Sequence, residues 1–228
     1  MKIYSILTMI MVVVVFSCKT EEKKETKAAQ TEVPEKELSI VEKLAYASGY
    51  ENWNHIKKLK FTFNVNERPG RTWIWFPKKN EVIAISDNDT LTYNRNDMDS
   101  TAYAMNGKFI NDKYWLMAPI NILWDEQSTT TEHTTNVEAP ISKKSMQKLT
   151  VTYNQQDGYT PGDAYDFYFD DDFMVKEWVF RRGNQPEPSM ITTWEDYTDI
   201  GGLKLSQMHK NGDGSFKLFF TDLEVETN

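Results

Sequence analysis

The sequence predicts a mainly β protein of the α+β class, built on a single curved antiparallel sheet that forms a half-open barrel of about 11 strands. Three observations support this prediction. Alternating apolar and polar residues recur between short turn sequences over most of the chain. A helical apolar pattern precedes the strands, and a second helical segment interrupts them near the middle of the chain. We therefore expect an N-terminal helix and a helical insertion that covers the concave face of the sheet.

Strands are expected where period-two patterns lie between turns rich in Gly, Asn, Asp and Pro. The expected strands are residues 59–65, 71–76, 81–86, 90–94, 101–110, 148–153, 164–169, 173–181, 189–197, 203–209 and 216–225. The Asn106-Gly107 pair in the fifth range is a strong hairpin signal. Consecutive hairpins give an antiparallel sheet, and a sheet this long should twist and curl.

Helices are expected on either side of the first strands. Residues 35–48 place apolar side chains at helical spacing, and Gly49 suits a helix C-terminus. Residues 111–126 also have a helical pattern, and Pro119 in their middle predicts a kink or two short helices. The Thr-rich residues 128–140 are expected to be irregular.

The amino terminus has the pattern of an export signal. Lys2 supplies a positive charge, and residues 6–16 are apolar except for one Thr. This run is about half the length that a helix needs to span a bilayer of roughly 30 Å, and it is typical of a signal-peptide core. Ser17 and then Cys18, the only cysteine, end the run. A signal-anchor helix with an incidental cysteine is the alternative.

Residues 15–18, Val-Phe-Ser-Cys, resemble the lipobox of bacterial lipoproteins. The resemblance implies a signal peptide at residues 1–17, cleavage before Cys18 and acylation of that cysteine. It places the chain in the cell envelope as an outer-membrane lipoprotein, on the periplasmic or the surface face. Residues 19–22, Lys-Thr-Glu-Glu, look like the acidic surface-export signals of some Bacteroidota lipoproteins, and a merely solvated spacer is the alternative.

Residues 18–37 are expected to be a disordered tether, because their Glu- and Lys-rich composition cannot bury enough apolar surface to offset ordering entropy. Residues 38–228 are expected to form one domain, acting as a monomer. Residues 1–17 hold one of the 26 basic residues and none of the 34 acidic ones, so the mature chain has a formal net charge of −9. This charge, without a basic patch, argues against nucleic acid as a partner and leaves the lipid anchor as the membrane contact.

Several expected strands are apolar on both faces, which requires a cover on each side. Trp73 and Trp75 share one face of their strand, whereas Ile74 lies on the other. Trp178 and Phe180 share a face, with Val175 and Val179 opposite. Helices would cover one side of the sheet, and an apolar ligand such as a lipid would occupy the concave cavity. The candidate ligand-binding residues are Trp73, Trp75, Trp115, Trp178 and Phe180; the alternative is an ordinary core.

The layout resembles the LolA/LolB/LppX superfamily of lipoprotein carriers and lipid-binding lipoproteins, and lipoproteins of Bacteroidota with the same layout. The local resemblance is carried by residues 193–197, Thr-Trp-Glu-Asp-Tyr, followed by Ile200, Gly202, Leu203 and Leu205. Ser206 stands where the family usually has Pro. The resemblance implies a half-open β-barrel with helices in its mouth and a cavity for acyl chains. An anchored chain differs in one respect from LolA itself, which is a soluble shuttle.

No catalytic or metal-binding constellation is visible, so neither an enzyme nor a cofactor or metal is expected. His55, His133 and His209 lie in different elements without ligand spacing, and His209 is expected at the surface of a strand end. Residues 170–172, Asp-Asp-Asp, are expected to form a turn. Two hypotheses remain: an envelope lipoprotein that binds an apolar ligand, or a structural or interaction lipoprotein with a self-filled core. A hydrolase is a distant third.

Overall fold

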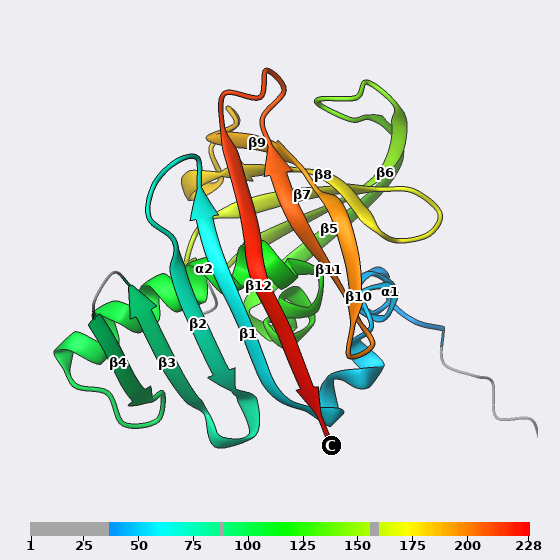
Figure 1. Cartoon of the computed structure of the whole chain (residues 1–228). Helices are drawn as coiled ribbons and strands as arrows, with labels where there is room; N and C mark the ends of the chain where they lie inside the picture. Colours follow the sequence, from blue (N-terminus) through cyan, green and yellow to red (C-terminus); the bar gives the residue numbers. More distant parts are fainter. Residues whose placement is uncertain (1–36, 87–88, 156–159) are drawn as a thin grey trace, which may run out of the picture. The chain divides into compact units, whose positions relative to one another are not determined.

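Twelve strands form two antiparallel sheets in the described part of the chain. The strands of one sheet run at an angle to the strands of the other (Figure 1). The seven-stranded sheet has the order β10-β11-β12-β1-β2-β3-β4, and the five-stranded sheet has the order β5-β6-β7-β8-β9. The mainly β, antiparallel class is confirmed, whereas the prediction of one sheet is wrong. The strands are β1 (Ile56–Val65), β2 (Arg71–Phe76), β3 (Glu81–Ser86), β4 (Asp89–Asn94), β5 (Thr129–Glu138), β6 (Ser145–Tyr153), β7 (Ala164–Phe169), β8 (Val175–Arg181), β9 (Met190–Thr193), β10 (Glu195–Ile200), β11 (Leu203–Lys210) and β12 (Lys217–Thr227).

The structure is a computed structural model, and it describes residues 37–86, 89–155 and 160–228. The predicted signal peptide, Cys18 and all of the predicted tether except Glu37 lie outside the described residues. The helices of the described part are α1 (Ile40–Ala47) and α2 (Ser100–Trp124), with short 3-10 turns η1 (Tyr50–His55), η2 (Pro77–Lys79), η3 (Glu126–Ser128) and η4 (Arg182–Asn184).

The two sheets separate at Trp194, within one segment that was expected to be a single strand. Thr193 pairs with Glu177 in the five-stranded sheet, whereas Glu195 pairs with Met208 in the seven-stranded sheet. The N–H of Trp194 itself donates to a carbonyl oxygen of β8 at 2.7 Å. The chain therefore passes from one sheet to the other at this residue, and the Trp194 side chain is buried at the joint.

Helix α1 confirms the predicted N-terminal helix and begins with a capping box. The Ser39 hydroxyl accepts from the N–H of Glu42 at 3.1 Å, and the Glu42 carboxylate accepts from the N–H of Ser39 at 2.7 Å. Gly49 follows the helix with a φ of 86°, and a Cβ atom at this position would lie 2.0 Å from the carbonyl oxygen of Gly202. Only glycine therefore permits this close approach of the helix end to the β10–β11 turn.

Residues 101–110 lie in helix α2, so the prediction of a strand there is wrong. The Asp99 side chain accepts from the N–H of Ala102 at 2.8 Å and caps the helix, so Asn106-Gly107 lies inside it and forms no hairpin. The predicted break is confirmed, because Met117 has a non-helical φ of −143° two residues before Pro119. Proline removes a helical N–H and disfavours helical geometry in the preceding turn.

Most of residues 128–140 lie in strand β5, so the prediction that this segment is irregular is wrong. The strand forms the outer edge of the five-stranded sheet and pairs along its length with β6. Its Thr side chains are mostly exposed, as an edge strand permits. β-Branched threonines favour strands even where no apolar alternation marks them.

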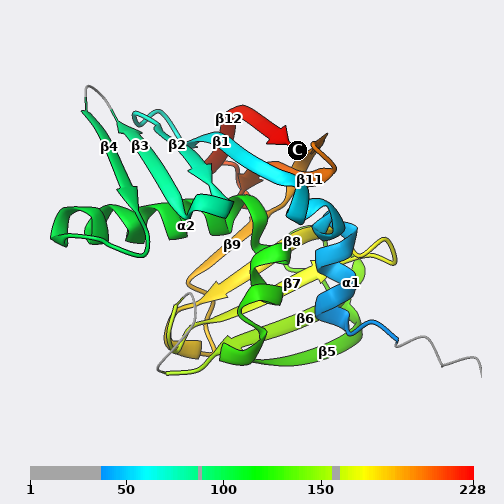
Figure 2. The same ribbon diagram turned by 90° about the horizontal axis from the view of Figure 1, so that it is seen from below.

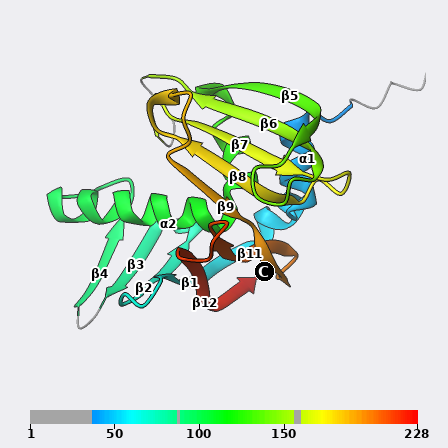
Figure 3. The same ribbon diagram turned by 90° about the horizontal axis from the view of Figure 1, so that it is seen from above.

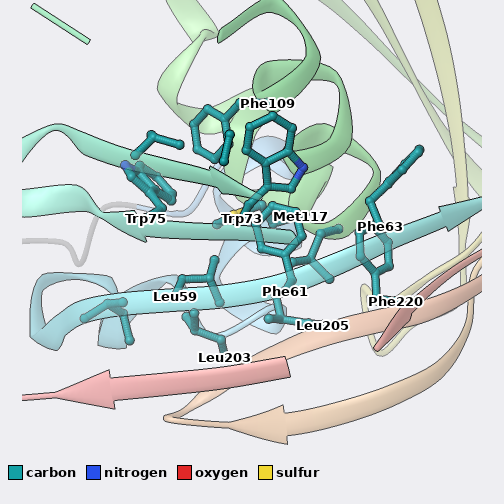
Figure 4. Close-up of a cluster of buried hydrophobic side chains, with 14 of the residues drawn as sticks. Leu59, Phe61, Phe63, Trp73, Trp75, Phe109, Met117, Leu203, Leu205 and Phe220 are labelled. Atoms are coloured by element: carbon teal, nitrogen blue, oxygen red, sulfur yellow. The ribbon is translucent and has the colours of Figure 1, made fainter. Parts of the chain in front are cut away.

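Helix α2 runs between the two sheets (Figures 2 and 3), and a hydrophobic cluster joins it to each of them. The first joins the seven-stranded sheet to Phe109, Leu116 and Met117 of α2 (Figure 4). The second joins the five-stranded sheet to Tyr114 and Ile122 of α2, together with residues of α1. The helical insertion thus covers inner faces of two sheets, whereas the prediction placed it over the concave face of a single sheet.

The outer face of the five-stranded sheet is covered by the chain's own β5–β6 connection. The buried Glu177 carboxylate of β8 accepts from the N–H groups of Ile141 and Ser142 at 2.7 and 2.9 Å. These bonds hold the connection against a small cluster that includes Met146 and Val179. The burial of β7 on both faces therefore requires no external molecule on this side.

A buried carboxylate joins α2 to the seven-stranded sheet. Asp112 is fully buried and accepts two hydrogen bonds from the Arg71 guanidinium, at 2.8 and 2.9 Å, and one from the Trp73 indole N–H at 2.9 Å. A bidentate pair of this kind fixes both distance and orientation. It sets the position of α2 over β2.

We predict that Asp112→Ala lowers the free energy of unfolding by about 3 kcal/mol, because it leaves the Arg71 guanidinium and the Trp73 indole without their acceptor. Urea unfolding measures the change. The control is Glu138→Ala, which removes a pair with Lys143 whose side chains are 68% and 66% exposed, and should cost less than about 0.5 kcal/mol. Equal losses for the two variants would contradict the structural role of Asp112.

Candidate functional site

The five predicted ligand-binding residues lie in two separate places. Trp73 and Trp75 of β2 belong to the first hydrophobic cluster, where they are 0% and 5% exposed (Figure 4). Trp115 of α2 lies beside Trp178 and Phe180 of β8. This second group lines one cavity, whereas Trp75 borders a different pocket.

This cavity, here called the β8–β9 cavity, has a volume of about 330 Å³. It lies between α2 and the ends of β7, β8 and β9. Its wall includes Tyr114, Trp115, Tyr165, Trp178, Phe180 and Met190. The volume is at the small end of the range of about 300–1,000 Å³ for ligand sites.

The aromatic wall is built by direct ring contacts. The Trp115 and Trp178 rings meet edge to face with centroids 4.4 Å apart. The Tyr165 ring packs against Trp178 at 5.3 Å and stacks on Phe180 at 5.1 Å. Such contacts stabilise the wall beyond simple burial, so the cavity is largely preformed. Phe180 and Met190, opposite one another on β8 and β9, are only half-buried and line its open part.

The rim of the cavity is polar. Asn111 and Arg182 are exposed there, and Asp163 is a half-buried residue of the lining. The Asp163 carboxylate accepts from the N–H of Gly183 at 2.7 Å, which fixes it to the β8–β9 connection. An apolar interior with a polar rim suits a ligand that has an apolar body and a polar end.

Sequence reasoning missed Tyr114, Tyr165 and Met190 as cavity residues. Period-two alternation placed Tyr165 on the same face of its strand as Phe167, but it did not show which face would meet Trp115. Tyr114 precedes Trp115 in the predicted helix, where helical spacing marks it only as an apolar position. Met190 gave no signal, because its role depends on pairing with Phe180.

His209 is fully buried, which corrects the prediction of a surface position. Its ring packs against those of Trp194 and Trp115 at 4.7 and 5.4 Å. Nδ1 lies 3.2 Å from the carbonyl oxygen of Thr193, and the imidazole also lies against the backbone of Trp115. The Trp115 carbonyl has no helical N–H partner four residues on, because that residue is Pro119.

Burial lowers the pKa of His209 to about 3, against smaller opposing effects of the Thr193 and Trp115 backbone. The imidazole is therefore neutral in the folded protein at neutral pH. Its ring packs beside the Trp194 side chain and fills space at the joint between the sheets.

The described residues contain no group of three or more His, Cys, Asp and Glu side chains placed to hold a metal ion. Asp170, Asp171 and Asp172 form the β7–β8 turn, as predicted. The Asp172 carboxylate accepts from the N–H of Met174 at 2.9 Å and pairs with Lys176. Within the described ranges, no helix combines the length and the apolar character needed to cross a membrane.

No protein-family model matches the chain, and no curated protein matches it either. Among solved structures, the chain is similar to the crystal structure of a LolA superfamily protein from Nitrosomonas europaea. The match covers 84% of this chain and 96% of that chain, with a TM-score of 0.46 and 9% sequence identity.

We predict a pH dependence of stability that comes from His209. The folded pKa of about 3 lies below the value of about 6.5 in the unfolded chain, so the unfolded state gains a proton first as the pH falls. The stabilisation is fully present above pH 6.5 and is lost at up to about 1.4 kcal/mol per pH unit as the pH falls towards 3.

Urea unfolding at pH 7 and pH 5 tests this prediction. The unmodified protein should lose about 2 kcal/mol more than His209→Gln between these values. His133→Gln, at an exposed position on β5, is the control and should keep the unmodified pH dependence. If His209→Gln retains the full dependence, other groups are responsible for it.

Proposed function

We propose that this chain is a cell-envelope lipoprotein of LolA-like fold, anchored through lipid on Cys18, which binds one small apolar or amphiphilic ligand in the β8–β9 cavity without catalysing a reaction. The observation that carries the proposal is the cavity itself, an aromatic hollow of about 330 Å³ with a polar rim. Preformed apolar cavities with a few polar groups are the usual sites of small-molecule binding.

The size of the cavity restricts the ligand class. Trp73 is fully buried in the first hydrophobic cluster, and Trp75 borders a separate pocket, so neither residue adds to the volume of the β8–β9 cavity. The remaining volume suits a single short acyl chain or a comparable apolar group better than a lipid with several chains. Asn111 and Arg182 at the rim would contact the polar end of such a ligand.

The membrane anchor rests on the sequence alone. The short apolar run that ends at Cys18 is typical of a lipoprotein signal, and the acidic chain offers no basic patch for anionic lipids. Attachment by acyl chains would hold a binding domain near the membrane, where apolar ligands are concentrated.

A structural or interaction lipoprotein is the second candidate. It is favoured by the burial of Trp73, Trp75 and Trp178, which are at most 5% exposed and pack on the chain's own residues. In that case the β8–β9 cavity would be a packing defect at the sheet edge. The following experiment separates the two candidates.

We predict that Met190→Trp weakens uptake of a fluorescent short-chain fatty acid by at least about tenfold, because the indole fills the open part of the cavity. Residues 37–228, which contain both hydrophobic clusters, are the material, so that no detergent competes for the cavity. The probe's emission measures binding, and urea unfolding confirms that the variant is folded.

The matched control is Ile191→Trp, at the next position of β9. Ile191 packs with the small cluster around Val179 on the outer face of the sheet, so the variant should bind the probe as the unmodified chain does. Absence of uptake by the unmodified chain, or equal uptake by both variants, would contradict ligand binding in this cavity and favour the interaction protein.

We predict that Cys18→Ser abolishes incorporation of labelled palmitate in a bacterial host and prevents cleavage before residue 18. The thiol is the acylated group, so the variant should migrate at the higher mass of the precursor. Radiolabelling and membrane fractionation provide the measurement. A chain that incorporates no palmitate and stays in the membrane at unchanged mass with or without the substitution would indicate a signal-anchor helix instead.

A further inference from the structure

A second pocket of about 360 Å³ lies at the other side of α2, here called the Lys113 pocket. It is formed by β2, the β4–α2 connection, η1 and the part of α2 on either side of the kink. Its lining includes Trp53, Trp75, Arg95, Lys113, Trp124 and Asp125. No residue of the β8–β9 cavity belongs to it.

Two cations face this pocket without an acidic partner in direct contact. Lys113 is 6% exposed, and its Nζ donates to the Asn121 side-chain oxygen at 2.5 Å, across the kink of α2. The Arg95 guanidinium donates to the amide oxygens of Asn106 and Asn80 at 3.0 and 3.2 Å. Neither cation forms an ion pair with a carboxylate in the described part of the chain.

The remaining walls are aromatic. The ammonium group of Lys113 lies 4.8 Å from the centre of the Trp124 ring and 5.5 Å from that of Trp75. Trp53 contacts both indoles, with centroids 4.8 and 5.1 Å away. Cation–π contacts stabilise a buried ammonium only in part, and its remaining hydrogens still need acceptors.

We propose that the Lys113 pocket binds an oxyanion, a phosphate or carboxylate group, between Lys113 and Arg95. A charged group buried to this degree is costly unless it is paired, and an oxyanion would supply acceptors to both cations at once. The half-buried Trp53 and Trp124 would contact the organic part of the ligand. The site is separate from the cavity of the proposed function and goes beyond it.

The electrostatics of the pocket support this assignment. Burial and then the charge of Arg95 lower the pKa of Lys113 to about 7, and Asp125 opposes this effect. The Asp125 carboxylate is itself engaged, because its Oδ2 accepts from Asn121 at 2.8 Å and from the Tyr153 hydroxyl at 3.1 Å. Tyr93, beside Arg95, remains neutral because burial raises its pKa. A bound oxyanion would raise the Lys113 pKa, so binding at pH 8 should be accompanied by proton uptake.

The test uses the full-length protein in a nonionic detergent, titrated with inorganic phosphate and with phenyl phosphate by calorimetry. Saturable binding of both is expected, with phenyl phosphate about tenfold tighter because of the indole wall. Lys113→Met should weaken both by at least about tenfold, and it should fold, since an apolar replacement of a buried charge is often tolerated. Lys108→Met, at an exposed position of the same helix, is the matched control and should bind as the unmodified protein does.

A measurement on the unmodified protein keeps the test independent of the variants. Indole N–H resonances in a nitrogen-15 spectrum should shift for Trp75 and Trp124 and stay constant for Trp194. No saturable binding of phenyl phosphate below about 10 mM, or equal affinity in Lys113→Met, overturns the proposal. Fatty-acid uptake by Lys113→Met should be unchanged, so failure here is distinguishable from failure of the cavity.

A third probe identifies the source of the oxyanion. Displacement of phenyl phosphate by the soluble lipid dihexanoyl phosphatidate supports the site with a lipid headgroup as its ligand. Binding of phenyl phosphate that this lipid does not displace supports the site with a soluble small molecule as its ligand.

Discussion

The kinked helix α2 is the element on which the described fold depends, because a single helix provides the inner core of both sheets. Phe109 and Leu116 pack on the seven-stranded sheet, whereas Tyr114 and Ile122 pack on the five-stranded sheet. A helix that is apolar on opposite faces is stable only when both faces are covered. The two sheets therefore pack around this helix, and the Asp112 hydrogen bonds fix its position.

The kink of α2 lies close to the point at which the chain passes from one sheet to the other. Pro119 has no N–H to donate to the carbonyl of Trp115, and His209 of β11 lies against this backbone. His209 also contacts Trp194, at which the chain passes from β9 to β10. The segment around Trp194 thus forms the joint between the sheets, and the Tyr197 hydroxyl donates to the carbonyl oxygen of Val175 at 2.8 Å.

The two candidate binding sites share the helix and use neighbouring residues of it. Lys113 faces its own pocket, whereas the next two residues line the β8–β9 cavity, since successive helical residues point in different directions. Tyr153 lies between the sites, with its hydroxyl 3.3 Å from that of Tyr114 and 3.1 Å from Asp125. Tyr153 therefore connects Tyr114, a wall residue of the β8–β9 cavity, to Asp125, a wall residue of the Lys113 pocket, through hydrogen bonds.

The sequence by itself determined the strands whose alternation is local, such as residues 59–65 and 90–94, because side chains on a strand alternate whatever they pack against. It did not determine residues 101–110, where the Asn-Gly pair favours a hairpin but burial of one face against β2 selects a helix. It also missed the bulge near Lys176, which turns Val175 to the same side as Trp178. Division into two sheets, the cavity and the Lys113 pocket were decided by tertiary structure alone, because each depends on contacts between residues far apart in the chain.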